Sequence, residues 1–349
     1  MLKKTLTAVL IVLALILAAA GALVIWLTVT EFSPESVENA DLVDMDGGAV
    51  SHDGVLKVIS FNTGYAVLGE ESEFFMDGGR EVRPDSRAVI DKNCEGILSI
   101  LAREDADFYL LQEVDLDSKR SYGINEAAKY AETLALSSAY AQNYSCEYVP
   151  FPLPTIGKVH SGLQTLSSYG IASAERIALP CPFSWPVSTA NLKRCLLVSR
   201  FDIVGSDKQL VIVNLHLEAY DDGEGKLEQT KVLSEFVESE YAAGNYVIAG
   251  GDFNQSFEGS RETYPIADPE KWTPGMLDDS MIPEGWSYAY DSSCATCRLL
   301  DAPLSEKSQL YVIDGFILSP NIEPVSVRTL DEGFRFSDHN PVVLEFMFK

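Results

Sequence analysis

The strongest constraint on the fold is an alternation of short apolar segments and helical segments that begins near residue 55. The expected strands are residues 55–61, 107–112, 195–201, 210–215, 246–249, 311–318 and 342–346, and the expected helices are residues 86–103 and 226–242. Strands interleaved with helices are typical of layered α/β folds. Residues 255–308 are irregular and rich in Pro, Gly and Trp, so this stretch is expected to form long loops over one face.

Polar side chains recur where the expected strands end. They are Asn62, Glu113, Asn214, His216, Asp252, Asn254, Asp314, Asp338 and His339. In layered α/β folds the strand ends open onto loops, where rigid elements can aim such side chains at one cleft. Carboxylates and amides without cysteine are oxygen ligands, which suit Mg²⁺, Mn²⁺ or Ca²⁺ better than zinc. The pattern therefore predicts a divalent-metal site.

Six short motifs carry these residues in a fixed order along the chain. They read SFN (60–62), LLQE (110–113), NLH (214–216), GGDFN (250–254), IDGF (313–316) and SDHNP (337–341). The ordered set resembles the endonuclease/exonuclease/phosphatase superfamily, the DNase- and sphingomyelinase-like metal-dependent phosphoesterases, from about residue 55 to residue 348. The resemblance implies a four-layer α/β sandwich, in which two packed mixed β-sheets are flanked by helices. It also implies hydrolysis of a phosphate ester by in-line attack of water.

The resemblance assigns metal and phosphate contacts to single positions. Glu113 would hold the metal ion, Mg²⁺ or else Mn²⁺ or Ca²⁺, with Asn62 and Asp338 close to it. Asn214 and His216 would contact the scissile phosphate, and His216 is also expected to be catalytic.

The remaining motif residues would handle the attacking water. Asp252 and Asn254 would orient or deprotonate it, and Asp314 would support His339. An Asp–His pair holds the imidazole in one tautomer and raises its pKa, so His339 can serve as a base or as a phosphate-stabilising cation. The general base is therefore either Asp252 or His339.

Looser matches extend the expected phosphate contacts, and one position departs from the pattern. Two further residues are candidate phosphate contacts: His160, in a segment that resembles a family strand, and Arg298, before the strand that carries Asp314.

Some nuclease members carry a second acid two residues after the first Asn, where this chain has Gly64. This departure weakens any transfer of a DNA-repair type of metal site.

The N-terminus carries an almost purely aliphatic run over residues 6–29, preceded by Lys3 and Lys4 and followed by acids. As a helix it is long enough to cross a hydrocarbon core of ~30 Å, and it exceeds the apolar region of about 7–15 residues of a cleavable signal peptide. The lysines before the run place the body outside the cytoplasm. We expect a single-pass cell-membrane protein with an anchor at residues 1–30, a polar linker at 31–54 and an extracytoplasmic catalytic domain at 55–349.

The cysteines and the net charge narrow the chemistry further. Cys294 and Cys297 form a C-x-x-C, and because no second such pair or His pair accompanies it, a disulfide is expected there rather than zinc. The formal net charge of −26 disfavours a polyanionic substrate such as long duplex DNA, because like charges repel.

Three functions remain open at this point. The preferred substrate is a phosphodiester with little surrounding charge, such as a sphingomyelin-type lipid head group. The alternative is an extracellular endonuclease or exonuclease acting on DNA or RNA. A third possibility, from another class, is a non-catalytic binding module at the cell surface. The sequence does not indicate a protein partner.

Overall fold

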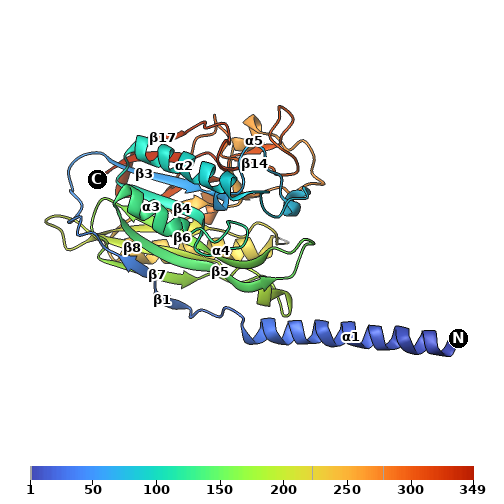
Figure 1. Cartoon of the computed structure of the whole chain (residues 1–349). Coiled ribbons are helices and arrows are strands. Elements are labelled where there is room, and N and C mark those ends of the chain that lie inside the picture. Colours follow the sequence, from blue (N-terminus) through green and yellow to red (C-terminus); the bar gives the residue numbers. More distant parts are fainter. Residues whose placement is uncertain (1, 222, 278) are drawn as a thin grey trace.

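Two large β-sheets pack face to face in the computed structural model, which describes residues 2–221, 223–277 and 279–349 (Figure 1). The first sheet has the order β1 (Val37–Asn39), β7 (Ser173–Ala178), β8 (Cys195–Asp202), β9 (Gln209–His216), β10 (Tyr246–Asp252), β16 (Asp314–Leu318) and β13 (Ser287–Ala289). The second has the order β17 (Ile322–Thr329), β18 (Val342–Phe348), β3 (Leu56–Asn62), β4 (Phe108–Asp115), β6 (Gly157–Ser167), β5 (Ser137–Val149) and β2 (Asp41–Val43). Both sheets mix parallel and antiparallel pairs.

Helices and short strands complete the chain. The α-helices are α1 (Leu2–Val29), α2 (Arg87–Glu104), α3 (Glu126–Leu134), α4 (Glu224–Ala242) and α5 (Ser260–Thr263). The 3₁₀ helices are η1 (Gly64–Ala66), η2 (Phe75–Asp77), η3 (Val187–Ala190) and η4 (Asp279–Met281). Two small sheets pair β11 (Gln255–Phe257) with β12 (Gly275–Leu277), and β14 (Cys297–Arg298) with β15 (Leu310–Tyr311).

Three apolar clusters separate four layers. Alternate residues of a strand point to opposite faces, so Val58 of β3 lies in the cluster between the two sheets, whereas its neighbour Ile59 packs with Ile97 of α2. On the other sheet, Val247 of β10 packs with Leu233 of α4. The layers are therefore α2 with α3, the second sheet, the first sheet, and α4, which confirms the four-layer sandwich. The strands read as continuous apolar runs because both of their faces are covered.

The N-terminal apolar run forms α1, a long helix that projects from the body (Figure 1). It is long and apolar enough to cross a membrane. The segment 31–54, expected to be a polar linker, instead contributes β1 to one sheet and β2 to the other. These strands have three residues each and exposed side chains, so backbone hydrogen bonds at the sheet edges hold them.

Candidate active site

The site is built where β3, β4, β9 and β10 end and where β16 begins. In the sheet register, Asp252 at the end of β10 lies opposite His216 of the parallel strand β9 and opposite Asp314 of the antiparallel strand β16. This register alone brings three of the expected residues side by side. Asn62 ends β3, which pairs with β4 in the facing sheet. His339 and Asp338 lie in the loop before β18.

A break in the β4–β6 ladder turns Glu113 toward the site. The register shifts between Leu111 and Val114, and Glu113 has a left-handed φ of 56°. The hydroxyl of Thr63 lies 3.0 Å from the carbonyl oxygen of Gln112 and 3.1 Å from that of Glu113. An irregular residue of this kind re-aims one side chain without ending the strand, and such bulges are common beside active sites.

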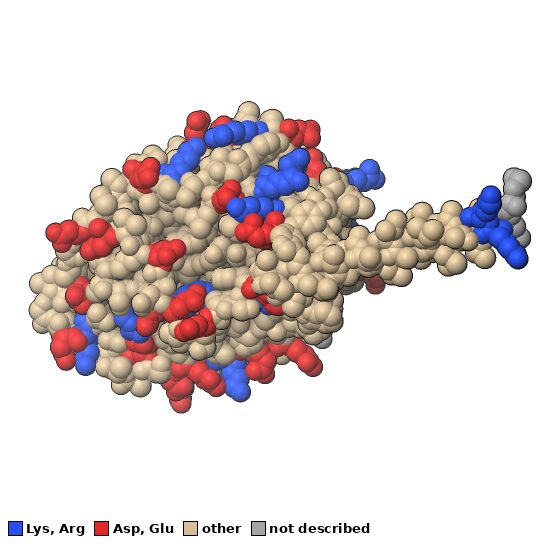
Figure 2. Space-filling view, turned by 60° about the horizontal axis from the view of Figure 1, so that its bottom comes forward, with Lys and Arg blue, Asp and Glu red and all other residues tan. Residues whose placement is uncertain are grey.

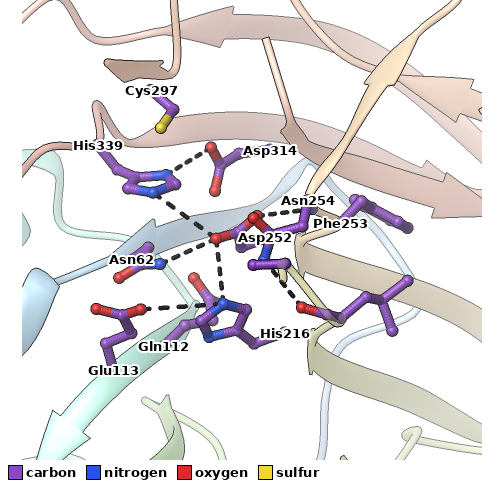
Figure 3. Close-up of polar contacts among 12 residues, drawn as sticks. Asn62, Gln112, Glu113, His216, Asp252, Phe253, Asn254, Cys297, Asp314 and His339 are labelled. Atoms are coloured by element: carbon purple, nitrogen blue, oxygen red, sulfur yellow. Dashed lines mark hydrogen bonds and ion pairs between the residues drawn. The ribbon is translucent and has the colours of Figure 1, made fainter. Parts of the chain in front are cut away.

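Asp252 is the centre of the cluster (Figure 3). Its Oδ2 accepts a hydrogen bond of 3.0 Å from Asn62 Nδ2 and lies 3.4 Å from His216 Nε2 and 3.7 Å from His339 Nε2. Its Oδ1 accepts from the backbone N–H of Asn254 at 2.8 Å. One carboxylate oxygen is thus surrounded by three nitrogen groups that come from three separate strands or loops.

Asp314 and His339 form a buried pair. Asp314 Oδ2 lies 2.8 Å from His339 Nδ1, which directs Nε2 of the ring toward Asp252. The hydroxyl of Thr296 accepts from the backbone N–H groups of Ile313 and Asp314 and so fixes the start of β16. The expected Asp–His unit is therefore assembled in the structure.

Burial and mutual charge shift the acidities of these groups. Burial, followed by the charge of Asp338, raises the pKa of Glu113 to about 8. Burial and the charge of Asp314 raise the pKa of Asp252 to about 6. Burial also raises the pKa of Asp338.

The two histidines shift in opposite directions. Burial and then the positive charge of Arg194 lower the pKa of His216 well below its usual value. Burial alone would lower the pKa of His339, but the charge of Asp314, with that of Asp252, outweighs it and raises that pKa well above the usual value. His216 is thereby held neutral and His339 protonated near neutral pH.

The site has the donor chemistry that a hard divalent cation requires. Glu113 and Asp338 are mutually repulsive carboxylates, and Oδ1 of Asp314 has no hydrogen-bond partner within the described residues. Two groups have ligand atoms within 4.8 Å of one another: Asp252, Asp314 and His339, and Cys297, Asp338 and His339. A cation between oxygens of this kind would offset both the burial and the repulsion that raise the pKa values of these carboxyl groups. The residues therefore fit Mg²⁺, Mn²⁺ or Ca²⁺.

Gly64 lies against this acidic group. Its φ is 54°, and a Cβ there would stand 2.9 Å from Oδ1 of Asp338 and 3.1 Å from Oγ of Ser337. The space in which another residue would place a side chain is thus occupied by the Asp338 carboxylate. This chain therefore has no room for the second acid that some nucleases carry at this position.

Three of the expected residues are not brought into the cluster. Asn214 is fully buried, and its amide donates to the carbonyls of Leu111 and Gln164 and accepts from Gln112, so it joins the two sheets. Its expected contact with the scissile phosphate remains a prediction. Arg298 is buried as well and donates to backbone carbonyls.

His160 lies on β6, where its ring is 3.3 Å from the carboxylate of Glu147. The side-chain partners of His160 and Arg298 thus lie outside the cluster around Asp252, although the backbone N–H of Arg298 donates to the carbonyl oxygen of Asp338 at 3.0 Å. Their expected contacts with phosphate remain predictions.

The structure adds a group of charges that the motifs did not contain. Arg120 is held by two hydrogen bonds to Asp115 and stacks on the ring of Tyr65, with its Cζ 3.1 Å from the ring centroid. Arg194 donates to Glu218 and to the carbonyl oxygen of His216. Both guanidinium groups are buried and lie close enough to shift pKa values at the site. Asp115 lies five residues before Arg120, but Tyr65, and the partners of Arg194, come from distant segments, so the sequence showed no local signal for these contacts.

The expected disulfide between Cys294 and Cys297 is not formed. All six cysteines are free thiols. Cys297 lies on β14, and its backbone forms an isolated β-bridge with that of His339. Its thiol lies near the side chains of Asp338 and His339. The Cys294 thiol instead contacts the carbonyl oxygen of Ala295. The two sulfur atoms therefore lie in different surroundings, although the two residues are only three apart in the sequence.

Two packed sheets with acids, amides and histidines gathered at their strand ends define a phosphoesterase-type α/β sandwich. A sequence model of the Endonuclease/Exonuclease/phosphatase family matches residues 93–339, and the chain belongs to this family. Its members are hydrolytic phosphoesterases. No curated protein matches the chain.

Solved structures share the fold at low sequence identity. An endonuclease/exonuclease/phosphatase from Beutenbergia cavernae DSM 12333 is 19% identical, with a TM-score of 0.59 over 85% of this chain and 72% of that one. A counterpart from Bacteroides vulgatus is 13% identical, with a TM-score of 0.56 over 85% of this chain and 100% of that one. D. rerio TDP2 complexed with single strand DNA product is 17% identical, with a TM-score of 0.52 over 84% of this chain and 99% of that one.

Proposed function

We propose that the chain is a divalent-metal-dependent phosphodiesterase tethered to the outer side of a membrane by α1. The observation that carries the proposal is the arrangement around Asp252, whose Oδ2 lies within 3.7 Å of Asn62, His216 and His339. A non-catalytic binding module has no need for a buried carboxylate among aligned polar groups, and burial of such groups is costly.

The chain's residues divide the work as follows. Asp252 takes the proton of the attacking water, because its pKa of about 6 leaves it ionised at neutral pH and Asn62 and Asn254 fix both of its oxygens. His339, protonated and held by Asp314, places positive charge beside the phosphoryl oxygens. His216, held neutral, adds a directed donor. This assignment favours Asp252 over His339 as the general base.

Glu113 and Asp338 are the proposed metal ligands, and Asn62 stands beside them. A bound Mg²⁺, Mn²⁺ or Ca²⁺ would stabilise the negative charge that gathers on the phosphate oxygens during reaction. Burial and, after it, the like charge of Asp338 raise the pKa of Glu113, and a cation there would favour the ionised form that both effects disfavour.

Contacts at the end of α1 support its retention as an anchor. Leu27 is buried against the body, Trp185 Nε1 donates to Thr28 Oγ1 at 3.0 Å, and Lys193 Nζ lies 2.7 Å from Glu31. A helix removed by signal cleavage has no reason to be built into the core of the mature domain. With Lys3 and Lys4 at its far end, the helix supports a single-pass protein whose body lies outside the cytoplasm.

Two substrate classes fit the same chemistry. A lipid head group such as that of sphingomyelin is favoured by the tether and by the net charge of −26. A nucleic acid is the second candidate, because TDP2, which shares the fold, has been solved with a single strand DNA product.

A substrate panel tests the proposal. The full chain in phospholipid nanodiscs is assayed on sphingomyelin vesicles, a single-stranded oligonucleotide and a supercoiled plasmid, with Mg²⁺, Mn²⁺ or Ca²⁺ and again with EDTA. The proposal expects metal-dependent release of phosphocholine. Nicking of the plasmid or shortening of the oligonucleotide without phosphocholine release would establish the nuclease instead, and the absence of any turnover would favour the binding module.

A further inference from the structure

Four large apolar side chains stand exposed on two loops beside the end of α1. Phe151 and Leu153, in the turn between β5 and β6, are 68% and 87% exposed, and Trp185 and Val187, at the start of η3, are 62% and 57% exposed. These four residues are called the docking patch below. Single exposed apolar residues are ordinary on a protein surface, whereas a group of them marks an interaction surface.

The docking patch is continuous with α1. Beneath it, Val149 and Ile156 of the β5–β6 hairpin form a buried cluster with Leu27 of α1, against which Leu23 and Ala190 also pack. Trp185 itself donates to Thr28 in the last turn of α1. The two loops and the end of the helix therefore rest on one shared apolar base. Figure 2 shows a largely uncharged surface where α1 leaves the body.

The docking patch also lies at the end of the molecule that carries the active site. In Figure 1, α1 leaves the body at the end toward which β3 points, and β3 ends at Asn62. The ring of Phe151 lies 6.0 Å from that of Phe75, and Asp77 of the same short helix, η2, accepts a hydrogen bond of 2.8 Å from Tyr220. Tyr220 follows His216 by four residues. A short series of contacts thus joins the patch to the loops around the site.

We propose that the docking patch inserts into the lipid bilayer that surrounds α1 and holds the active-site end of the body against the membrane surface. The proposal rests on the membrane anchor put forward above. Aromatic side chains favour the membrane interface, and large aliphatic side chains gain free energy by leaving water. With the body fixed in this way, the site meets phosphate esters displayed on the same membrane, and the tether acts as an orienting device as well as an attachment.

The test measures contact with lipid directly. The full chain is reconstituted into phosphatidylcholine vesicles that contain a quencher-bearing lipid, and Leu153→Cys is labelled with a fluorophore. The matched control is Val204→Cys, since Val204 is also apolar, is 63% exposed, and lies in the turn that precedes β9, at the opposite end of that strand from His216. The unsubstituted chain gives the background from the six native thiols.

We expect the label at Leu153 to be quenched by about twofold or more and the label at Val204 to be unaffected. Adding Phe151→Ser and Val187→Ser should reduce the quenching at Leu153, whereas Val325→Ser, at another exposed apolar residue, should not. Equal quenching of both labels, or quenching of neither, overturns the proposal. Flotation of the vesicles reports on the anchor, and turnover of a soluble ester reports on catalysis, so failure of either is distinguished from failure of docking.

Discussion

Replacement of Asp314 by Asn tests whether Asp314 and His339 act as one unit. Asp314 Oδ2 and His339 Nδ1 are 2.8 Å apart, and their side chains are 1% and 6% exposed. A hydrogen bond between charged partners contributes about 1.5–3 kcal/mol. If His339 acts as a cation in the transition state, this loss lowers kcat/KM by about 10- to 100-fold.

A double-mutant cycle is the assay. Asp314→Asn, His339→Ala and the double variant are compared with the natural chain on a soluble phosphodiester. Because a positioning partner has nothing left to position once the ring is gone, the double variant should lose little more than His339→Ala alone. Strictly additive losses would refute the pairing.

The ionisation of His339 gives a second, independent readout. The pKa of His339 is raised in the folded protein, so the pair stabilises the fold fully below pH about 6.5, and this stabilisation is lost as the pH rises through the folded-state pKa. The difference in Tm between the natural chain and Asp314→Asn should therefore be largest under acidic conditions. In NMR titrations of the ring resonances, the variant should lose its His339 proton at a lower pH. An unchanged titration would show that Asp314 does not hold that proton.

Three further outcomes follow from the site and the anchor. Because the pKa of Glu113 is raised to about 8, the folded protein keeps a proton on this carboxyl that the unfolded chain releases, so in EDTA the Tm should fall as the pH rises from about 4.5 to 8. Mg²⁺ should restore the Tm most at pH 8. A Tm that does not change with pH would place the metal elsewhere. Gly64→Ala should destabilise the fold by about 1–3 kcal/mol in chemical denaturation and weaken metal binding in calorimetry, since its φ of 54° and the approach to Asp338 both resist a side chain. The body should be digested by external protease in intact cells, and protection there would reverse the proposed topology.

The parts of the fold that the sequence predicted are those with strong local patterns. The strands that end at Asn62 and Asp252, and the strand that begins at Asp314, are apolar on both faces, so their existence and the polar residues at their ends were visible in the sequence. The edge strand β1 could not be anticipated, because its three residues carry no apolar pattern and its pairing with β7 depends on the assembled sheet.

The site shows the same division between local and long-range information. In the sequence Asn214 looks like one more polar residue of a motif, yet in the structure its amide forms hydrogen bonds that join the two sheets. Arg120 approaches Tyr65 only once β3 and β4 have paired, and a cation–π contact of that kind leaves no spacing to recognise. The thiols of Cys294 and Cys297 diverge because β14 pairs with β15 and presents Cys297 to His339.

The most direct test of the proposed chemistry is hydrolysis of bis(p-nitrophenyl) phosphate by the full chain and by Asp252→Asn. This ester is small and soluble, so its turnover depends on neither the lipid nor the nucleic-acid hypothesis. We expect turnover with Mg²⁺, Mn²⁺ or Ca²⁺, loss of turnover in EDTA, and a decrease of about 10²–10⁴-fold in the variant, because a general base contributes on that scale. Turnover that persists in EDTA, or that Asp252→Asn leaves unchanged, would contradict a metal-dependent phosphodiesterase centred on Asp252.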